Sequence, residues 1–277
     1  SALFAGAMSS IDRVFKNGNL LYTIHDTTVY SGIGNVALFD YIRLTRSGLS
    51  KYEDLSSTEA RSVRCIKDPS SSVRSESILQ VKPCKTETED NCEYGELLDR
   101  RDSRIYKTVK IGTQTWMAEN LEYASLASSH SCRDGRLYKW SNVMDSTGAW
   151  STNGLGCGYN KMCSPAFPVR GLCPEGWHLP SKAEWETLFV AVGGRATAGK
   201  VLKSTSNWSN GGNGIDAFGF SALPVGYIKD DDKCEFHGSQ TKFWSSTEDN
   251  SSKVYGLAVD SYNEDASLDL LDKNYGF

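Results

Sequence analysis

Eight cysteines are the residues of this sequence with the clearest capacity for chemistry, because their number is even and some lie close together. Zinc sites need thiolates at short spacings such as C-x2-4-C, whereas the close pairs here have seven and five intervening residues. Disulfides in an oxidising compartment are therefore favoured over zinc ligands or free thiols, and the connectivity stays open. The cysteines expected in disulfides are Cys65, Cys84, Cys92, Cys132, Cys157, Cys163, Cys173 and Cys234.

Tryptophans beside amide and hydroxyl side chains form the second group with binding chemistry. An aromatic ring presents an apolar face to the C–H surface of a sugar, and neighbouring polar groups hold its hydroxyls in a concave site. The candidate ligand-binding residues are Trp208 with Asn207, Asn210 and Asn213, and Trp150 with Asn153. The alternative for each is a tryptophan packed on its own domain, which we expect for Trp116, Trp177, Trp185 and Trp244.

The remaining polar motifs give weak signals for metal binding or catalysis. Glu248 and Asp249 are weak calcium candidates, because hard cations take clustered oxygen ligands, and no other cofactor is expected. His178 lies between Trp177 and Leu179, which favours a packed structural role. No G-x-S-x-G nucleophile context is present. We therefore expect no catalytic residues and no enzymatic activity.

The charge and hydropathy patterns exclude several classes of partner. The 277 residues carry 34 Asp plus Glu against 30 Lys plus Arg, a net charge of −4, which argues against a broad basic surface for nucleic acid. No apolar run is long enough for a transmembrane segment, and residues 1–6 do not have the pattern of a signal peptide. The many glycines and aromatic residues are typical of a strand-rich, loop-rich extracellular module.

Local patterns predict the elements that would position these residues. Residues 106–111 alternate lysine with apolar residues, and the turn at 112–113 leads into a pairing strand at 114–118. Ser181 and Glu184 form a capping box, which predicts a helix whose apolar stripe is followed by Gly193 and Gly194. A second short helix is expected over residues 198–202.

An internal repeat organises the chain, since residues 221–226 match residues 1–6 at four of six positions. Strand-like runs follow at 36–39 and 254–259. We therefore interpret residues 1–68 as the C-terminal part of a diverged repeat that ends in a closing strand. Residues 69–104 are interpreted as a linker, and residues 105–277 as the main domain, without its own last strand.

Four motifs together resemble a known family, the Fibrobacter succinogenes major paralogous domain of secreted and lipid-anchored bacterial surface proteins. They lie at residues 106–121, 171–181, 218–226 and 243–248, and residues 62–68 resemble the closing strand of that domain. More distantly, residues 177–185 and Arg64–Cys65 are similar to the formylglycine-generating-enzyme family. Both resemblances imply an α+β, C-type-lectin-like fold with small antiparallel sheets, one or two helices and long disulfide-stapled loops. The N-terminal partial repeat is expected to be rich in β-strand.

The resemblance also implies a disulfide and a function. It pairs Cys173 with Cys65 of the closing strand, either within the chain or from a neighbouring subunit. The paired active-site cysteines of the formylglycine enzymes have no clear match, so catalysis is not implied. The expected function is adhesion, or polysaccharide or partner binding, by a secreted, non-catalytic bacterial cell-surface protein. The alternative is a structural subunit of an extracellular filament, assembled by exchange of residues 61–68 between copies.

Overall fold

The computed structural model describes residues 10–16, 19–25, 42–43, 60–69, 80–124, 129–132, 135–228 and 233–273. The chain divides into two compact units, Ser1–Leu55 and Ser56–Phe277. The first unit contains an antiparallel sheet in the order β1 (Ser10–Lys16), β2 (Asn19–His25) and β3 (Ile42–Arg43). The strand expected at 36–39 and the motif at 1–6 lie outside the described residues, so the repeat stays a prediction.

A five-stranded sheet forms one side of the second unit, in the order β10-β4-β7-β6-β5. The predicted hairpin is confirmed as β6 and β7, which pair antiparallel around Gly112, where the backbone has φ +61°. Part of the expected linker is instead β5, the outer strand of this sheet. The bounds are β4 (Ile66–Lys67), β5 (Tyr94–Asp99), β6 (Arg104–Ile111), β7 (Gln114–Met117) and β10 (Trp177–His178).

A three-stranded sheet, β13-β14-β15, and two short hairpins complete the strands of the second unit. Its long strands bury apolar side chains where they face the core, as expected for half-buried antiparallel strands. The bounds are β8 (Ser129–Cys132), β9 (Gly135–Tyr138), β11 (Tyr227–Ile228), β12 (Cys234–Glu235), β13 (Gln240–Glu248), β14 (Lys253–Asp260) and β15 (Ser267–Asp272).

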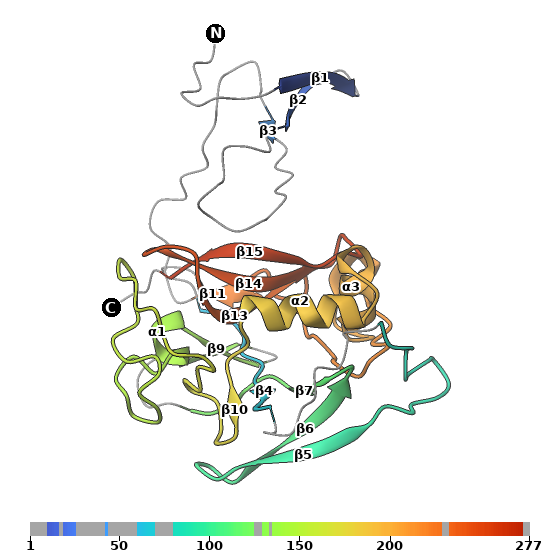
Figure 1. Cartoon of the computed structure of the whole chain (residues 1–277). Helices are drawn as coiled ribbons and strands as arrows, with labels where there is room; N and C mark the ends of the chain where they lie inside the picture. Colours follow the sequence, from blue (N-terminus) through green and yellow to red (C-terminus); the bar gives the residue numbers. More distant parts are fainter. Residues whose placement is uncertain are drawn as a thin grey trace. The chain divides into compact units, whose positions relative to one another are not determined.

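The longest helix, α2 (Lys182–Ala191), lies between the two larger sheets (Figure 1). The predicted capping box is confirmed, since Ser181 accepts a hydrogen bond from the Glu184 amide and the Glu184 carboxylate accepts one from the Ser181 amide. The second predicted helix is also confirmed, as α3 (Arg195–Leu202). Two single turns are α1 (Trp140–Val143) and the 3-10 helix η1 (Ser209–Gly211).

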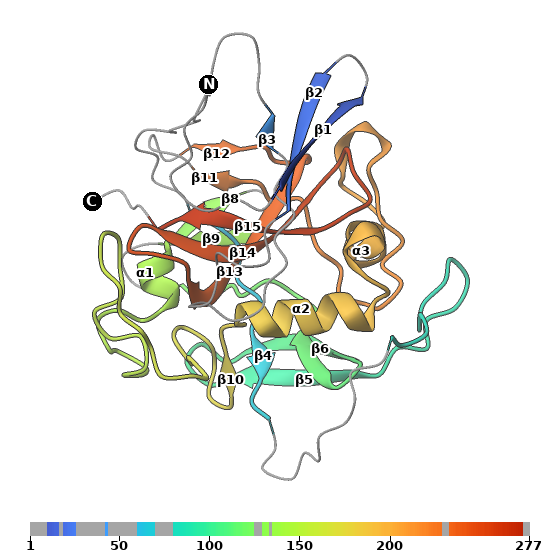
Figure 2. The same cartoon turned by 45° about the horizontal axis from the view of Figure 1, so that its top comes forward.

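Aromatic side chains fill the space where α2 meets both sheets. The rings of Trp116 and Trp185 stack with centroids 4.7 Å apart, and Phe220 packs edge-on against both. Phe243 of β13 completes the cluster. The four tryptophans assigned to the core from the sequence are all buried, and Figure 2 shows α2 again between the same two sheets.

Residues 60–69 run through the centre of this unit as its closing segment. Isolated bridges join Ala60, Arg61 and Ser62 to β11, β9 and β13 in turn. Ile66 in β4 then pairs with Trp116 of β7 and with His178 of β10. The segment therefore contacts four sheets or hairpins that come much later in the sequence.

Four disulfides staple the second unit and leave no free cysteine in the described part of the chain. Their pairs are Cys65–Cys173, Cys84–Cys92, Cys132–Cys234 and Cys157–Cys163. The first is the pair that the resemblance implied, here formed within the chain. The predicted class is confirmed: a mixed α+β fold with few helices, small antiparallel sheets and disulfide-bonded loops. Among the described residues, no helix has the length and apolar character to cross a bilayer.

Candidate functional site

A hollow of about 620 Å³ opens on the second unit and contains one of the two predicted tryptophans. Three separate stretches of chain form it: the end of β5 with the turn that follows, the loop after α1, and the loop before β10. Its lining residues are Leu98, Asp99, Arg100, Arg101, Trp150, Arg170 and Glu175. We call it the Trp150 hollow.

The loop that carries Trp150 is held by a single buried aspartate. Both carboxylate oxygens of Asp145 accept hydrogen bonds from the backbone amides of Ala149 at 2.9 Å, and of Trp150 and Ser151 at 2.6 Å. On the far side of the loop, Gly154 lies so close to the preceding turn that an added Cβ would meet the Met144 carbonyl oxygen at 1.9 Å. These contacts fix the backbone before any ligand binds.

Trp150 is 37% exposed, and its ring is supported from one side. Its edge-on partner is Tyr123, at 5.7 Å between ring centroids and an interplanar angle of 87°. The Arg101 guanidinium lies 4.0 Å from the Tyr123 ring centre and 5.3 Å from that of Trp150. The ring is therefore held in place while part of its surface stays open to solvent.

The charged side chains around the hollow differ in their partners and in their exposure. Arg101 forms a two-point ion pair with the buried Asp99, with N–O distances of 2.8 and 2.6 Å, and also donates to the Leu172 carbonyl. Arg170 is half-buried and donates to the carbonyl oxygens of Trp150 at 2.9 Å and Cys173 at 3.2 Å. Arg100 and Glu175 are exposed.

This arrangement suits binding by stacking and hydrogen bonding. Its lining offers an aromatic face, guanidinium donors and one exposed carboxylate, and contains no serine, cysteine or histidine. A serine or cysteine nucleophile and a histidine base are thus absent from the lining. The hollow therefore has the composition of a ligand site.

Trp208, the other predicted sugar platform, is buried, so the expectation of an exposed ring was wrong. It is 5% exposed, and its indole N–H donates to the Ser204 hydroxyl and the Ala222 carbonyl, both at 3.1 Å. The neighbouring polar residues shape the loop that covers it. Asn213 accepts from the Trp208 amide, and Asn207 and Asn210 occupy positive-φ turn positions, at φ 73° and 59°.

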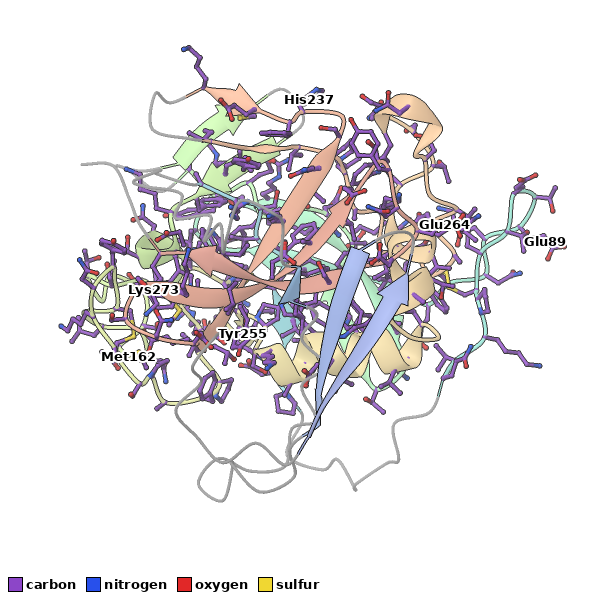
Figure 3. The ribbon with its side chains drawn as sticks, turned by 90° about the horizontal axis from the view of Figure 1, so that it is seen from above. Glu89, Met162, His237, Tyr255, Glu264 and Lys273 are labelled. Atoms are coloured by element: carbon purple, nitrogen blue, oxygen red, sulfur yellow. A yellow bond between two sulfur atoms is a disulfide. The ribbon has the colours of Figure 1, made fainter. Side chains whose placement is uncertain are left out.

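The other predicted binding residues hold loops together. Asn153 donates to the Ala166 carbonyl at 3.3 Å, within the loop region that follows Trp150. Glu248, predicted as a weak calcium ligand, accepts from the amides of Cys163 and Ser164 and forms a buried ion pair with Lys273. The Glu248 carboxylate is therefore already engaged by a cationic side chain and two backbone amides. Figure 3 labels Lys273 and Met162 of the neighbouring loop.

Asp249, the second calcium candidate, is also engaged in local hydrogen bonds. Its carboxylate accepts from the Tyr255 hydroxyl at 3.0 Å and from the Asn250 side-chain amide at 2.9 Å. Across the described ranges, no three histidine, cysteine or acidic side chains come together in an arrangement that could hold a metal ion.

His178 is buried and joins the closing segment to α2. One ring nitrogen lies 2.7 Å from Asp68 and the other 2.7 Å from Glu184. Burial favours the neutral ring, but the hydrogen bonds and charges of Glu184 and Asp68 outweigh it and raise the pKa of His178. In the same way, contact with His178 overcomes the effect of burial and lowers the pKa of Glu184.

The sequence offered Trp150 as a candidate, but not the charged residues that line the same hollow. Arg100, Arg101, Arg170 and Glu175 come from two regions that are distant in the sequence from Trp150. The Arg100–Arg101 pair in a turn between two strands was the one local signal, and interpreting residues 69–104 as a linker concealed it.

Comparisons with known proteins agree with the motifs noted in the sequence. A family model described as the Fibrobacter succinogenes major domain matches residues 109–276, more than half of the chain. Neither the curated proteins nor the solved structures contain a match to this chain. The chain therefore belongs to the Fibrobacter succinogenes major domain family.

Proposed function

We propose that this chain is a non-catalytic binding module of a secreted bacterial cell-surface protein, and that its ligand is a polysaccharide. Family membership and the four disulfides, which persist in oxidising compartments, support this location. The Trp150 hollow is the proposed binding site.

The observation that carries the proposal is the partly open ring of Trp150 on a preformed loop. Three amides bound by Asp145 fix the loop, and Tyr123 supports the ring. A site that is ordered before the ligand arrives loses little conformational entropy on binding. Binding of a polymer whose individual contacts are weak is favoured as a result. A hollow of about 620 Å³ is in the range of small-ligand sites and can take a short stretch of a sugar chain.

The test is binding to immobilised polysaccharides. We expect the full chain to be retained by at least one polymer of a plant and bacterial polysaccharide panel in affinity electrophoresis. Trp150→Ala should weaken that retention roughly tenfold or more, as for a central aromatic contact, whereas Trp150→Tyr should keep much of it.

The matched control is Tyr262→Ala, which removes an aromatic ring that is 72% exposed and outside the Trp150 hollow. It should bind as the wild type does. Equal retention of Trp150→Ala and the wild type would contradict the proposed site, provided that both variants keep the unfolding temperature of the wild type.

The alternative function is a filament built by exchange of residues 61–68 between copies. The deep burial of most of this segment supports it. Arg61, Arg64 and Ile66 are buried among residues from much later in the chain, and the same contacts could be made with a second copy. In that arrangement Cys65 of one chain would be joined covalently to Cys173 of the next.

A non-reducing denaturing gel distinguishes the two arrangements. Exchange predicts a ladder of disulfide-linked multimers that collapses to a monomer on reduction, together with filaments in negative-stain microscopy. Migration only as a monomer before reduction, with a Cys65–Cys173 peptide of intramolecular origin, would exclude disulfide-sealed exchange.

A further inference from the structure

We infer that the Trp150 hollow selects an acidic polysaccharide, whose sugar rings carry carboxylate or sulfate groups. This inference rests on the proposed function and names the class of ligand for the same site.

The hollow is locally cationic on a chain that is acidic overall. Three arginines and two carboxylates line it, whereas the whole chain has 34 acidic residues against 30 lysines and arginines. Asp99 and Arg101 neutralise one another in a buried two-point pair. The remaining charges are the two positive side chains of Arg100 and Arg170 and the one carboxylate of Glu175. Their net charge is positive, so the hollow favours an anion.

Arg100, which is exposed, and Arg170, which is half-buried, are of the type that recognises anionic oxygens. A guanidinium carries five N–H donors in a planar fork, which matches the paired oxygens of a carboxylate or sulfate. Arg170 uses its Nε and one Nη atom in bonds to backbone carbonyls, and these bonds fix its orientation. The second of these carbonyls belongs to Trp150, so the Arg170 guanidinium is anchored to the backbone of the residue that carries the aromatic ring.

An aromatic ring and guanidinium groups in one hollow favour a ligand that has both a sugar ring and an anionic group. A sugar ring can stack on Trp150 while its anionic substituent reaches a guanidinium, and Glu175 can accept hydrogen bonds from hydroxyl groups. Arginines exclude a metal cation from the hollow. Because the positive charge is confined to two side chains, the site does not provide the extended basic surface that nucleic acid requires.

The experiment measures binding of the full chain to three soluble polymers by isothermal titration calorimetry at low and high salt. Polygalacturonate supplies carboxylates, dextran sulfate supplies sulfates, and hydroxyethyl cellulose is neutral. We expect at least one acidic polymer to bind roughly tenfold or more tightly than the neutral one at low salt. The preference should shrink as salt screens the charges.

Two arginine variants locate the interaction. Arg100→Gln removes an exposed charge from the hollow and should weaken binding of the preferred acidic polymer about three- to tenfold. Arg195→Gln removes an exposed charge at the start of α3, outside the hollow, and should leave that affinity unchanged. Trp150→Ala should weaken binding of every polymer that is bound.

Three results would overturn the inference. Equal affinity for neutral and acidic polymers, lost in Trp150→Ala, would disprove acidic selectivity and leave the proposed function intact. An equal loss in Arg100→Gln and Arg195→Gln would show attraction by overall charge in place of a site. Absence of binding to all three polymers and to the wider polysaccharide panel would overturn both the inference and the proposed function.

Discussion

Ionised side chains in the interior of the second unit hold together segments that are far apart in the sequence. Arg64 is fully buried and donates to Asn120 and to the carbonyl oxygens of Met117, Phe220 and Ser221. Desolvation lowers its pKa to about 9, which still leaves it charged at neutral pH. Its hydrogen bonds anchor the closing segment to two distant loops.

His178 makes the same kind of link in a form that depends on pH. As an imidazolium it donates to Asp68 on one side and Glu184 on the other. Its raised pKa means that its contribution to stability is complete below the ordinary histidine value of 6.5 and is lost as pH rises through the folded value. The lowered pKa of Glu184 gives a contribution that is complete above 4.5 and is lost as pH falls.

We therefore predict that the pair stabilises the fold most between about pH 4.5 and 6.5. The free energy of unfolding, measured with urea, should decline as pH rises above 6.5, and His178→Gln should abolish much of that decline. His237→Gln is the matched control, at a histidine in another loop (Figure 3), and should keep it. The same decline in wild type and His178→Gln would show that other groups cause it.

At this scale, the exposure of a side chain could not be predicted from its neighbours in the sequence. Trp150 and Trp208 have similar polar neighbours in the sequence, yet one is partly open and the other is buried. The difference depends on contacts with residues more distant in the chain. The Trp208 indole donates a hydrogen bond to the Ala222 carbonyl, and Tyr123 and Arg101 pack against the Trp150 ring. A window of neighbouring residues does not contain this information.

Elements with a distinct local sequence signal were predictable, and a strand preceded by polar, acidic sequence was not. The capping box of α2 and the β6–β7 turn each lie within a few residues, so the sequence predicted them. Strand β5 has an acidic, polar sequence before it and pairs only with β6, which follows it. The turn to β6 is short, with Asp99 paired to Arg104, so the partner of β5 is local; the polar composition before the strand nevertheless pointed to a linker.

The disulfides differ in the length of chain that they close, which gives a prediction at the scale of elements. Cys65–Cys173 spans 108 residues, whereas Cys157–Cys163 spans six. On the chain-entropy model, the long bridge should contribute about 5 kcal/mol and the short one about 2 kcal/mol.

The measurement compares two double variants by urea unfolding. Cys65→Ser with Cys173→Ser should lose clearly more stability than Cys157→Ser with Cys163→Ser. A larger loss from the short bridge would instead indicate that the loop around Met162, which contacts Glu248 and Lys273 through its neighbours, matters more than chain entropy.

At the scale of the whole molecule, the family match and the second compact unit do not cover the same residues. The family model begins at residue 109, but the second unit extends back to Ser56 and includes the closing segment. The Trp150 hollow needs this larger unit, because Leu98, Arg100 and Arg101 precede the family match. Its lining comes from the end of β5 with the turn that follows and from two stretches of loop, and no sequence pattern indicated that these lie together.

We predict that a fragment of residues 56–277 folds as an independent unit, since it contains all eight cysteines and both main core clusters. It should unfold in a single cooperative thermal transition and show no reactive thiols in the oxidised state. A fragment that starts at residue 105 should not reach this state, because it lacks Arg64, Cys65 and β5. Equal stability of the two fragments would contradict the central role of residues 60–69.

The position of the closing segment has a consequence for how the chain matures during its synthesis. Residues 60–69 leave the ribosome before every strand that they contact, and Ser62 cannot meet Phe243 until almost the whole unit has been made. Cys65 is therefore exposed to Cys84 and Cys92 before Cys173 exists. If the exported chain is oxidised in the same order, the wrong cysteines would be joined, so we expect the native pairing to depend on late oxidation of Cys65 or on a disulfide isomerase.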